Sequence, residues 1–400
     1  MTTTRGRSRT SDLLIVALVL TGLSMRTAVT SVGAALDDLQ RDLHASGTVA
    51  GVITTLPVVC FAAGGALTPR LSRALGSHRL LVITLVLTTI GLALRPIGSS
   101  AIWFTLLSIL ALSGGAASNV LMPSLVKQHF PDRIGAMTAV YTTALAVGTT
   151  AAAGLTVPIG DAAGGWRGGL ASWAVFSALA VFPWLPTLAA DRVHRDAAEP
   201  GISMAALLRS RTAWALTVFF AMQSLQAYIA FGWFARFLDD HGMSNATAGA
   251  MVALLAAIGI PVSLVAPRVR QERHRALIAA FGACFLVAYL GLAIAPTSGT
   301  WIWMVLAGTG GGMFPVSLTL IGLRTRSAGT TAALSAFMQA IGYIVAGTGP
   351  LLFGALFGAT GSWALPMTVL FVSLGITLAA AWPSTADRFV DDELAPSHRG

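Results

Sequence analysis

One arginine stands in the middle of a long apolar stretch, where a charged side chain is costly to bury. Arg26 lies 14 residues after Asp12 and 11 residues before Asp37, and no other charge lies between those two acids. In a helix these separations correspond to roughly 21 Å and 16 Å. An arginine at the centre of a membrane helix costs about 2.5–3.5 kcal/mol. We therefore expect a specific partner for this guanidinium.

Two interpretations of Arg26 stay open at this point. In the structural one, the guanidinium hydrogen-bonds to helix carbonyls or to Asn119. In the functional one, it lines a central cavity and binds an anion or a strongly dipolar group. All 16 acidic residues fall in loops or at the ends of apolar stretches, so no embedded carboxylate neutralises Arg26. This favours the functional interpretation, because a planar guanidinium suits carboxylate-like or planar polar partners.

Uncharged polar residues in the middle of apolar stretches are the next candidates for a substrate site. They are Asn119, Gln223, Gln226, Gln339 and Tyr343. Gln223 and Gln226 lie one helical turn apart, and they flank Ser224, which an offset of 198 residues aligns with Arg26. The alternative for each residue is an interhelical hydrogen bond, which membrane proteins use to hold helices together.

Two stretches rich in glycine and proline suggest moving helices. GGAASNVLMP (114–123) and GTGGGMFP (308–315) occupy corresponding places in the two halves of the chain. Small residues permit close helix approach and prolines permit bends. Paired interruptions of this kind are typical of cavity-lining transporter helices, and close packing is the alternative. The candidate gating residues here are Gly114, Gly115, Pro123, Gly311 and Pro315.

Titratable groups are scarce inside the apolar stretches. The seven histidines lie in loops or near span ends, and Asp37 and Asp38 follow the first stretch, where they could take protons or simply be solvated. A weakly acidic substrate could also carry the proton. Cys60 and Cys284 stand alone in apolar surroundings, so we expect free thiols, no metal site and no cofactor. Without a nucleophile–base pair at depth or a nucleotide-binding loop, an embedded enzyme and an ATP-driven pump are disfavoured.

The composition indicates which elements position these residues. Hydrophobic residues make up 55% of the 400-residue chain and charged residues only 10%, so lipid must be the main solvent. We predict an all-α membrane protein with twelve transmembrane helices of about 20 apolar residues or more. Their approximate limits are 11–36, 46–67, 79–97, 101–126, 134–158, 164–188, 212–238, 245–267, 276–295, 301–323, 330–357 and 362–382.

The chain reads as two related six-helix bundles. We predict an N-terminal bundle at 1–188, a cytoplasmic linker loop at 189–211, and a C-terminal bundle with a short tail at 212–400. Ala-Gly at 50–51 recurs at 248–249, and Pro-Arg at 69–70 recurs at 267–268, both at the offset of 198. A duplicated unit with the substrate site between its halves is a known transporter plan.

The placement of lysine and arginine predicts the topology. Of the 25 basic residues, 20 fall on the side of the membrane that holds both termini, and only Arg41, Arg95, Arg167 and Arg236 fall on the other side. The positive-inside rule then puts both termini in the cytoplasm. Because the N-terminal apolar stretch shows no cleavage site, we expect a first membrane helix rather than a removed signal.

These features resemble the major facilitator superfamily. MRTAVTSVGAALDDLQRDL, NVLMPSLVKQHFPDRIGAMTAVYTTALAVG, GGWRG and SAFMQAIGY are similar to its cyanate transporter-like and 2-nitroimidazole transporter-like branch. The superfamily's loop signature is similar to the segment from Gly65 to Arg79, although Pro69 stands where an aspartate is usual. Gly65, Arg70 and Arg73 of this segment are further gating candidates, and the two arginines could bind carbonyl ends or acidic lipid headgroups. The resemblance implies alternating access, with a small anion or a polar heteroaromatic compound as substrate.

We therefore expect a secondary active permease, an antiporter or symporter, in a bacterial-type inner membrane. It would be a monomer with a small-molecule substrate, lipid as its surroundings, protons as a possible coupling ion and no nucleic acid. The alternative within transport is a broad efflux permease for lipophilic drugs, although Arg26 argues against cationic substrates. A receptor or sensor is disfavoured, because the 189–211 loop is too short for a soluble signalling domain.

Overall fold

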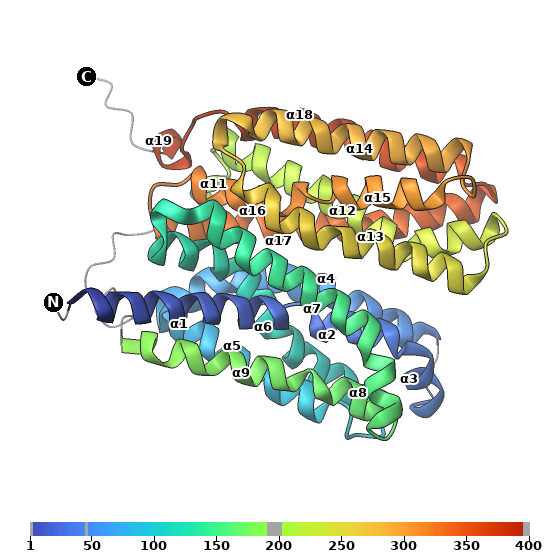
Figure 1. Cartoon of the computed structure of the whole chain (residues 1–400), viewed down its shortest axis with the longest axis horizontal. Helices are drawn as coiled ribbons and strands as arrows, with labels where there is room; N and C mark the ends of the chain where they lie inside the picture. Colours follow the sequence, from blue (N-terminus) through green and yellow to red (C-terminus); the bar gives the residue numbers. More distant parts are fainter. Residues whose placement is uncertain (1–2, 45–46, 190–201, 395–400) are drawn as a thin grey trace. The chain divides into compact units, whose positions relative to one another are not determined.

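The structure is a computed structural model that describes residues 3–44, 47–189 and 202–394. Within these ranges every regular element is an α-helix or a short 3-10 helix (Figure 1). Eleven helical segments of the described chain are long and apolar enough to cross a membrane, and the 29-residue helix α4 (Gly47–Leu75) lies where the second span was predicted. The prediction of an all-α membrane protein is confirmed.

The chain divides into two compact units. The first consists of Met1–Phe130 and Val140–Gly201, and the second of Pro131–Ala139 and Ile202–Gly400. Most of the predicted linker, residues 190–201, lies outside the described residues. The domain limits drawn from the sequence stay a prediction.

The first unit consists of helices α1 to α6, α8 and α9, together with α7 from Val140 onward. Tight pairs within it are α5 with α6, α4 with α6, and α1 with α9. The hydroxyl of Thr88 on α5 donates to the carbonyl of Ala111 on α6 (3.0 Å) and accepts from the amide of Gly114 (2.9 Å). The bounds are α1 (Thr3–Ser24), α2 (Thr27–Ala34), α3 (Leu36–Asp42), α4, α5 (Ser77–Leu94), α6 (Ala101–His129), α7 (Ile134–Ala162), α8 (Trp166–Ser172) and α9 (Ala174–Trp184).

The second unit contains the helices from α11 onward, and α12 packs extensively on α17 and α18. Serine residues cap several of its helices, for example Ser210 before α12 and Ser327 before α17. The bounds are α11 (Met204–Leu207), α12 (Arg211–Asp240), α13 (Asn245–Val265), α14 (His274–Ile294), α15 (Thr300–Gly310), α16 (Met313–Leu323), α17 (Ala328–Thr360), α18 (Ala364–Ser384) and α19 (Val390–Leu394).

Three predicted spans are interrupted in the described part of the chain. The first is divided into α1 and α2 at Met25–Arg26, the sixth into α8 and α9 at Trp173, and the tenth into α15 and α16 at Gly311–Gly312 (Figure 1). The fourth span, where the sequence suggested a matching interruption, is the single helix α6. Its glycines serve close packing, because a Cβ at Gly114 would collide with the Thr88 hydroxyl of α5.

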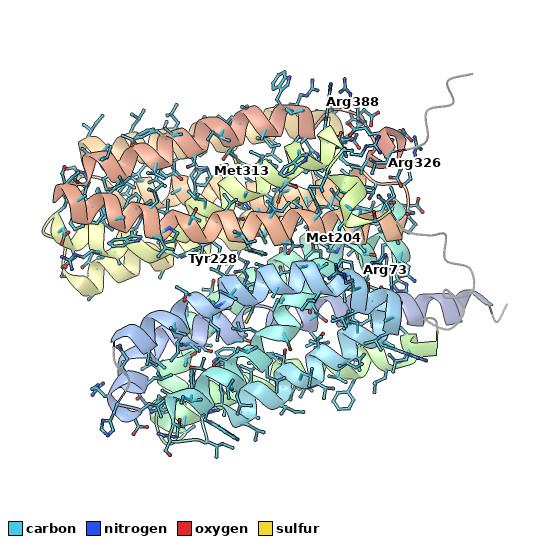
Figure 2. The ribbon with its side chains drawn as sticks, turned by 180° about the vertical axis from the view of Figure 1, so that it is seen from behind. Arg73, Met204, Tyr228, Met313, Arg326 and Arg388 are labelled. Atoms are coloured by element: carbon cyan, nitrogen blue, oxygen red, sulfur yellow. The ribbon has the colours of Figure 1, made fainter. Side chains whose placement is uncertain are left out.

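The short acidic helix α19 fastens one end of the second unit. Glu393 accepts hydrogen bonds from the hydroxyls of Ser210 and Thr212 (2.6 Å each) at the start of α12. Asp391 accepts from the amide of Arg326 (2.8 Å), just before α17, and Asp392 pairs with its guanidinium (2.7 and 2.8 Å). Figure 2 shows Arg326 and Arg388 at this end. Carboxylates at helix N-termini accept hydrogen bonds from amides that have no partner within the helix, and their negative charge interacts favourably with the helix dipole.

Candidate functional site

The interruption at Arg26 lies within a segment rich in serine and threonine, TGLSMRTAVTS. Arg26 has φ −117° and ψ −5° and occupies the N-cap position of α2. Side-chain hydroxyls donate hydrogen bonds to nearby backbone carbonyls: Ser24 to Thr21 O (2.9 Å), Thr27 to Ser24 O (3.0 Å) and Thr30 to Arg26 O (3.1 Å). In a membrane a helix can break only where such groups satisfy the backbone.

Helix α6 packs closely against the backbone at this interruption. A Cβ at Gly115 would lie 2.5 Å from the carbonyl oxygen of Met25, which is well inside van der Waals contact. A glycine is therefore required there for α6 to contact the backbone immediately before Arg26. Gly115 is one of the predicted gating residues, and its position at the interruption gives it a structural role.

Side chains from α4 and α6 surround the Arg26 region. The guanidinium carbon of Arg26 lies 5.0 Å from the centroid of the Phe61 ring on α4, within the range of a cation–π interaction. Asn119 is buried one turn beyond Gly115, and its amide nitrogen donates to Gly115 O (2.9 Å). Arg26 itself is half-buried. The first unit thus brings two predicted site residues, Arg26 and Asn119, to the same interruption.

The guanidinium of Arg26 is the main source of positive charge in this region, because the C-terminus of α1 at Ser24 lies close to the N-terminus of α2 and offsets part of its dipole. The eight-residue helix α2 starts at Arg26, so its N-terminal partial positive charge lies beside the guanidinium. Discontinuous helices of transporters point such half-helix N-termini at anionic substrate groups. The guanidinium and the helix end together suit a carboxylate-like or electron-rich planar group.

In the second unit, Gln226 is held by protein groups from three helices. Its amide oxygen accepts from the Tyr289 hydroxyl of α14 (2.9 Å), and its nitrogen donates to the Thr377 hydroxyl of α18 (2.9 Å) and to Met222 O (3.2 Å). It is 1% exposed. This arrangement favours the interhelical bond over the substrate contact at Gln226.

The remaining polar candidates of this unit lie on α12 and α17. Gln223 bonds only to its own helix in the described contacts, through Phe220 O (3.1 Å) and the Ser224 hydroxyl (2.7 Å). Gln339 donates to the Ser335 hydroxyl (2.9 Å). The buried Tyr343 ring meets the Phe220 ring edge-on at 5.3 Å. Because α12 packs on α17, Gln223 lies on a helix next to the one that carries Gln339 and Tyr343.

Tyr228, labelled on α12 in Figure 2, is half-buried, and its hydroxyl finds no hydrogen-bond partner among the described residues. Trp233, one and a half turns further on, donates instead to Pro350 O (3.0 Å) and so ties α12 to α17. Of these two aromatic residues, Tyr228 is thus the better candidate for contact with a solute.

The predicted gating residues at the signature segment lie on a helix rather than in a loop. Helix α4 continues through Gly65 and Arg70 to Leu75. Arg73, labelled in Figure 2, donates to the carbonyl of Pro69 (3.2 Å) within the same helix. Pro123 is buried inside α6, and Pro315 is buried in the first turn of α16, just after the Gly311–Gly312 interruption. Their gating role stays a prediction.

The predicted proton-linked pair follows α2, on α3. Asp38 is exposed and pairs with Arg41, and the side chain of Asp37 lies outside what the structure describes. Nearby, Asp42 pairs with Arg167 and accepts from the Trp166 indole (3.1 Å), both from the GGWRG motif. The Arg167 hydrogen bond holds the pKa of Asp42 below its ordinary value.

Two residues of this region were not predicted. Phe61 lies in the second span, and a single phenylalanine in a membrane helix gives no signal of a cation–π contact. Arg95 was counted with the loop arginines, but its side chain is fully buried and bonds to α2. The only available signal was its position inside the predicted 79–97 span, which also fits an arginine that reaches the surface.

Comparison with known proteins agrees with this architecture. The Major Facilitator Superfamily profile matches residues 15–347. The 2-nitroimidazole transporter of Escherichia coli is 32% identical over 369 residues, which cover 90% of this chain and 93% of that protein. The cyanate transport protein CynX of the same organism is 28% identical over 358 residues, covering 88% and 91%.

Among solved structures, the proton:xylose symporter XylE shares the fold. The TM-score is 0.74 at 13% identity, over 94% of this chain and 96% of XylE. A family match over most of the chain, two full-length relatives and the shared fold all agree with the twelve-span plan. The chain is a transporter of the major facilitator superfamily and belongs to its cyanate and 2-nitroimidazole transporter-like branch.

Proposed function

We propose that this protein is a secondary active transporter that moves a small anionic or polar heteroaromatic solute by alternating access, with Arg26 as the central binding cation. The single observation that carries the proposal is the interruption of the first span at Arg26. It puts a guanidinium and the N-terminus of α2 together in one short segment. Both groups favour negative charge, and both lie far from the ends of the span.

The chemistry of the two named relatives fits this site. Cyanate is a small anion, and 2-nitroimidazole is a planar heteroaromatic compound whose two nitro oxygens carry partial negative charge. A guanidinium presents paired donors in one plane to either kind of group, and Phe61 offers an aromatic face beside it. We propose that the substrate belongs to one of these two classes.

We choose the remaining substrate contacts among the polar residues whose side chains are not already bonded to several other helices. In the first unit we propose Asn119, which lies at the interruption. In the second unit we propose Gln223, Gln339 and Tyr343, with Tyr228 added because of its hydroxyl. Gln226 moves to a structural role, because three protein groups already bond to its amide.

We further propose that the transporter works as a monomer in a plasma membrane with both termini in the cytoplasm. The cytoplasmic placement of both termini is supported by the distribution of basic residues, 20 against 4. Protons are the proposed coupling ion. They would be carried by an exposed acid such as Asp38 or by a weakly acidic substrate.

The test is uptake into proteoliposomes, with labelled cyanate and 2-nitroimidazole as probes and with or without a pH gradient. Arg26→Ala and Arg26→Lys are both expected to lower uptake by at least about 100-fold while the protein still inserts, since lysine keeps the charge but loses the planar fork. Arg236→Ala, which removes an exposed arginine that pairs with Asp240, is the matched control. Normal uptake by Arg26→Ala would refute the proposal, and wild-type transport of a cationic dye would favour the drug-efflux alternative.

A further inference from the structure

A second arginine is buried in the first unit, immediately after α5. Arg95 is 0% exposed. One terminal nitrogen donates to the carbonyl of Ala28 (3.0 Å) and the other to the hydroxyl of Ser31 (2.9 Å), both on α2. Its guanidinium carbon lies 5.5 Å from the centroid of the Phe104 ring on α6. The side chain therefore links α5 and α6 to the short helix that begins at Arg26.

The placement of Arg95 is costly for a residue that serves packing alone. None of the ion pairs among the described residues includes Arg95, and its Nε–H finds no acceptor there. Burying a guanidinium without a carboxylate carries a large desolvation cost, and apolar residues in such places often give equal or better stability. The two planar donors instead fix the position of a particular backbone segment.

Helix α2 needs such an anchor. It has eight residues and is separated from α1 by the interruption, and an isolated helix of that length is unstable. On the α1 side, the tight contact of Gly115 with the Met25 carbonyl fixes the backbone. On the α2 side, the bonds from Arg95 reach residues two and five positions beyond Arg26. The interruption is thus held from both sides.

We infer that Arg95 is a positioning residue: it anchors α2 and thereby holds Arg26, at the N-cap of that helix, in its substrate-binding geometry. This inference rests on the proposed role of Arg26. Arg95 itself is sealed between α2 and Phe104, so it acts through α2. Small displacements of a binding group can reduce a rate or an affinity by large factors.

The experiment places a reporter on α2 itself. Gly33 is exposed, and a Cβ there would meet no atom within 4 Å, so Gly33→Cys accepts a spin label without disturbing the packing. The label is attached in a Cys60→Ala, Cys284→Ala background. Its electron paramagnetic resonance line shape then reports the mobility of α2 in the full-length protein, whatever the substrate is.

Three variants are compared in this background. Arg95→Met removes both bonds to α2, Arg95→Lys keeps the charge with a single donor group, and Ser31→Ala removes one acceptor while leaving Arg95 in place. Thr88→Val is the matched control, because it removes a buried bridge between α5 and α6 without contacting α2. All four are measured at equal amounts of monodisperse protein.

The expected result is a mobile component in the spectrum of Arg95→Met, a smaller one in Arg95→Lys and Ser31→Ala, and none in Thr88→Val. With cyanate and 2-nitroimidazole as probes, KM should rise about tenfold in Arg95→Met, with a smaller rise in Arg95→Lys and Ser31→Ala. In Thr88→Val, KM should stay within about twofold of wild type.

Two outcomes would overturn the inference. One is an immobile label in both Ser31→Ala and a folded Arg95 variant. The other is a mobile label in Thr88→Val as well, because that would show a general loss of packing. Failure of the proposed function is recognised separately: Arg26→Ala would then transport normally, while the label on α2 still responds to Arg95.

Discussion

Replacing Gln226 by leucine is expected to destabilise the second unit, whereas the same change at Gln223 is expected to affect transport. Gln226 makes two interhelical hydrogen bonds, with Tyr289 of α14 and Thr377 of α18. The contacts of Gln223 stay within α12. The two glutamines are one turn apart, so each is the matched control for the other.

The magnitude follows from these bonds. Interhelical side-chain hydrogen bonds in membranes average about 0.6 kcal/mol and reach about 1.7. Two such bonds, with the Tyr289 hydroxyl left buried without its acceptor, give about 1–3 kcal/mol. Gln223→Leu should cost less than about 0.5 kcal/mol, because no interhelical bond is lost.

The assay is thermal unfolding in detergent, combined with uptake of cyanate and 2-nitroimidazole. Gln226→Leu should lower Tm by several degrees, at about 2–4 °C per kcal/mol, and Tyr289→Phe should remove part of the same energy, so the double variant is less than additive. Unchanged Tm with lost uptake in Gln226→Leu would refute the structural role and return this residue to the substrate site.

Two further predictions concern other contacts. Burial alone would raise the pKa of Glu393, but hydrogen bonds from Ser210 and Thr212 outweigh it and hold the pKa below its ordinary value. Because the pKa is lower in the folded protein, Glu393 stabilises the folded state near pH 7 and loses this effect as the pH falls toward about 4. The Tm difference between wild type and Glu393→Gln should therefore shrink over that range. A constant difference would contradict this prediction. Gly115→Ala should lower both Tm and uptake, because the added Cβ would lie 2.5 Å from the Met25 carbonyl oxygen. Gly33→Ala is the control: its Cβ would lie in open space, so Tm should stay unchanged or rise slightly. Equal behaviour of the two variants would contradict the close approach of α6 to Met25.

Hydropathy predicted the helices well because it reports directly on the solvent of each segment. The positions of Arg26 and Asn119 were also within reach of the sequence, since polar residues in apolar stretches are conspicuous. The interruption of the first span was not predicted, although TGLSMRTAVTS contains the hydroxyls that stabilise it. Threonines also occur inside unbroken helices, such as Thr84, Thr88 and Thr89 of α5, so the presence of hydroxyls alone does not distinguish the two cases.

Partners across helices were beyond sequence reasoning. Gln226 and Gln223 look equivalent along the chain, and only the packing of α14 and α18 shows which of them is bonded to other helices. Arg95 and Arg41 both count as basic residues on the same side of the membrane, although one is fully buried and the other is exposed. Charge placement predicts topology, but it carries no information on which arginine reaches a carbonyl of another helix.

The two halves of the duplicated chain have diverged in where they break. In the first unit one interruption falls in the first span and bears a charge, and another divides the sixth span at Trp173, while α6 stays whole and its glycines serve close contact. In the second unit the corresponding helix α12 is unbroken, and the interruption falls at Gly311–Gly312 between α15 and α16. A charged interruption suits binding, because it offers a cation and a helix end. An interruption made of glycines offers no such group and suits bending, so we expect substitutions at Gly311 to change the rate of transport more than the affinity.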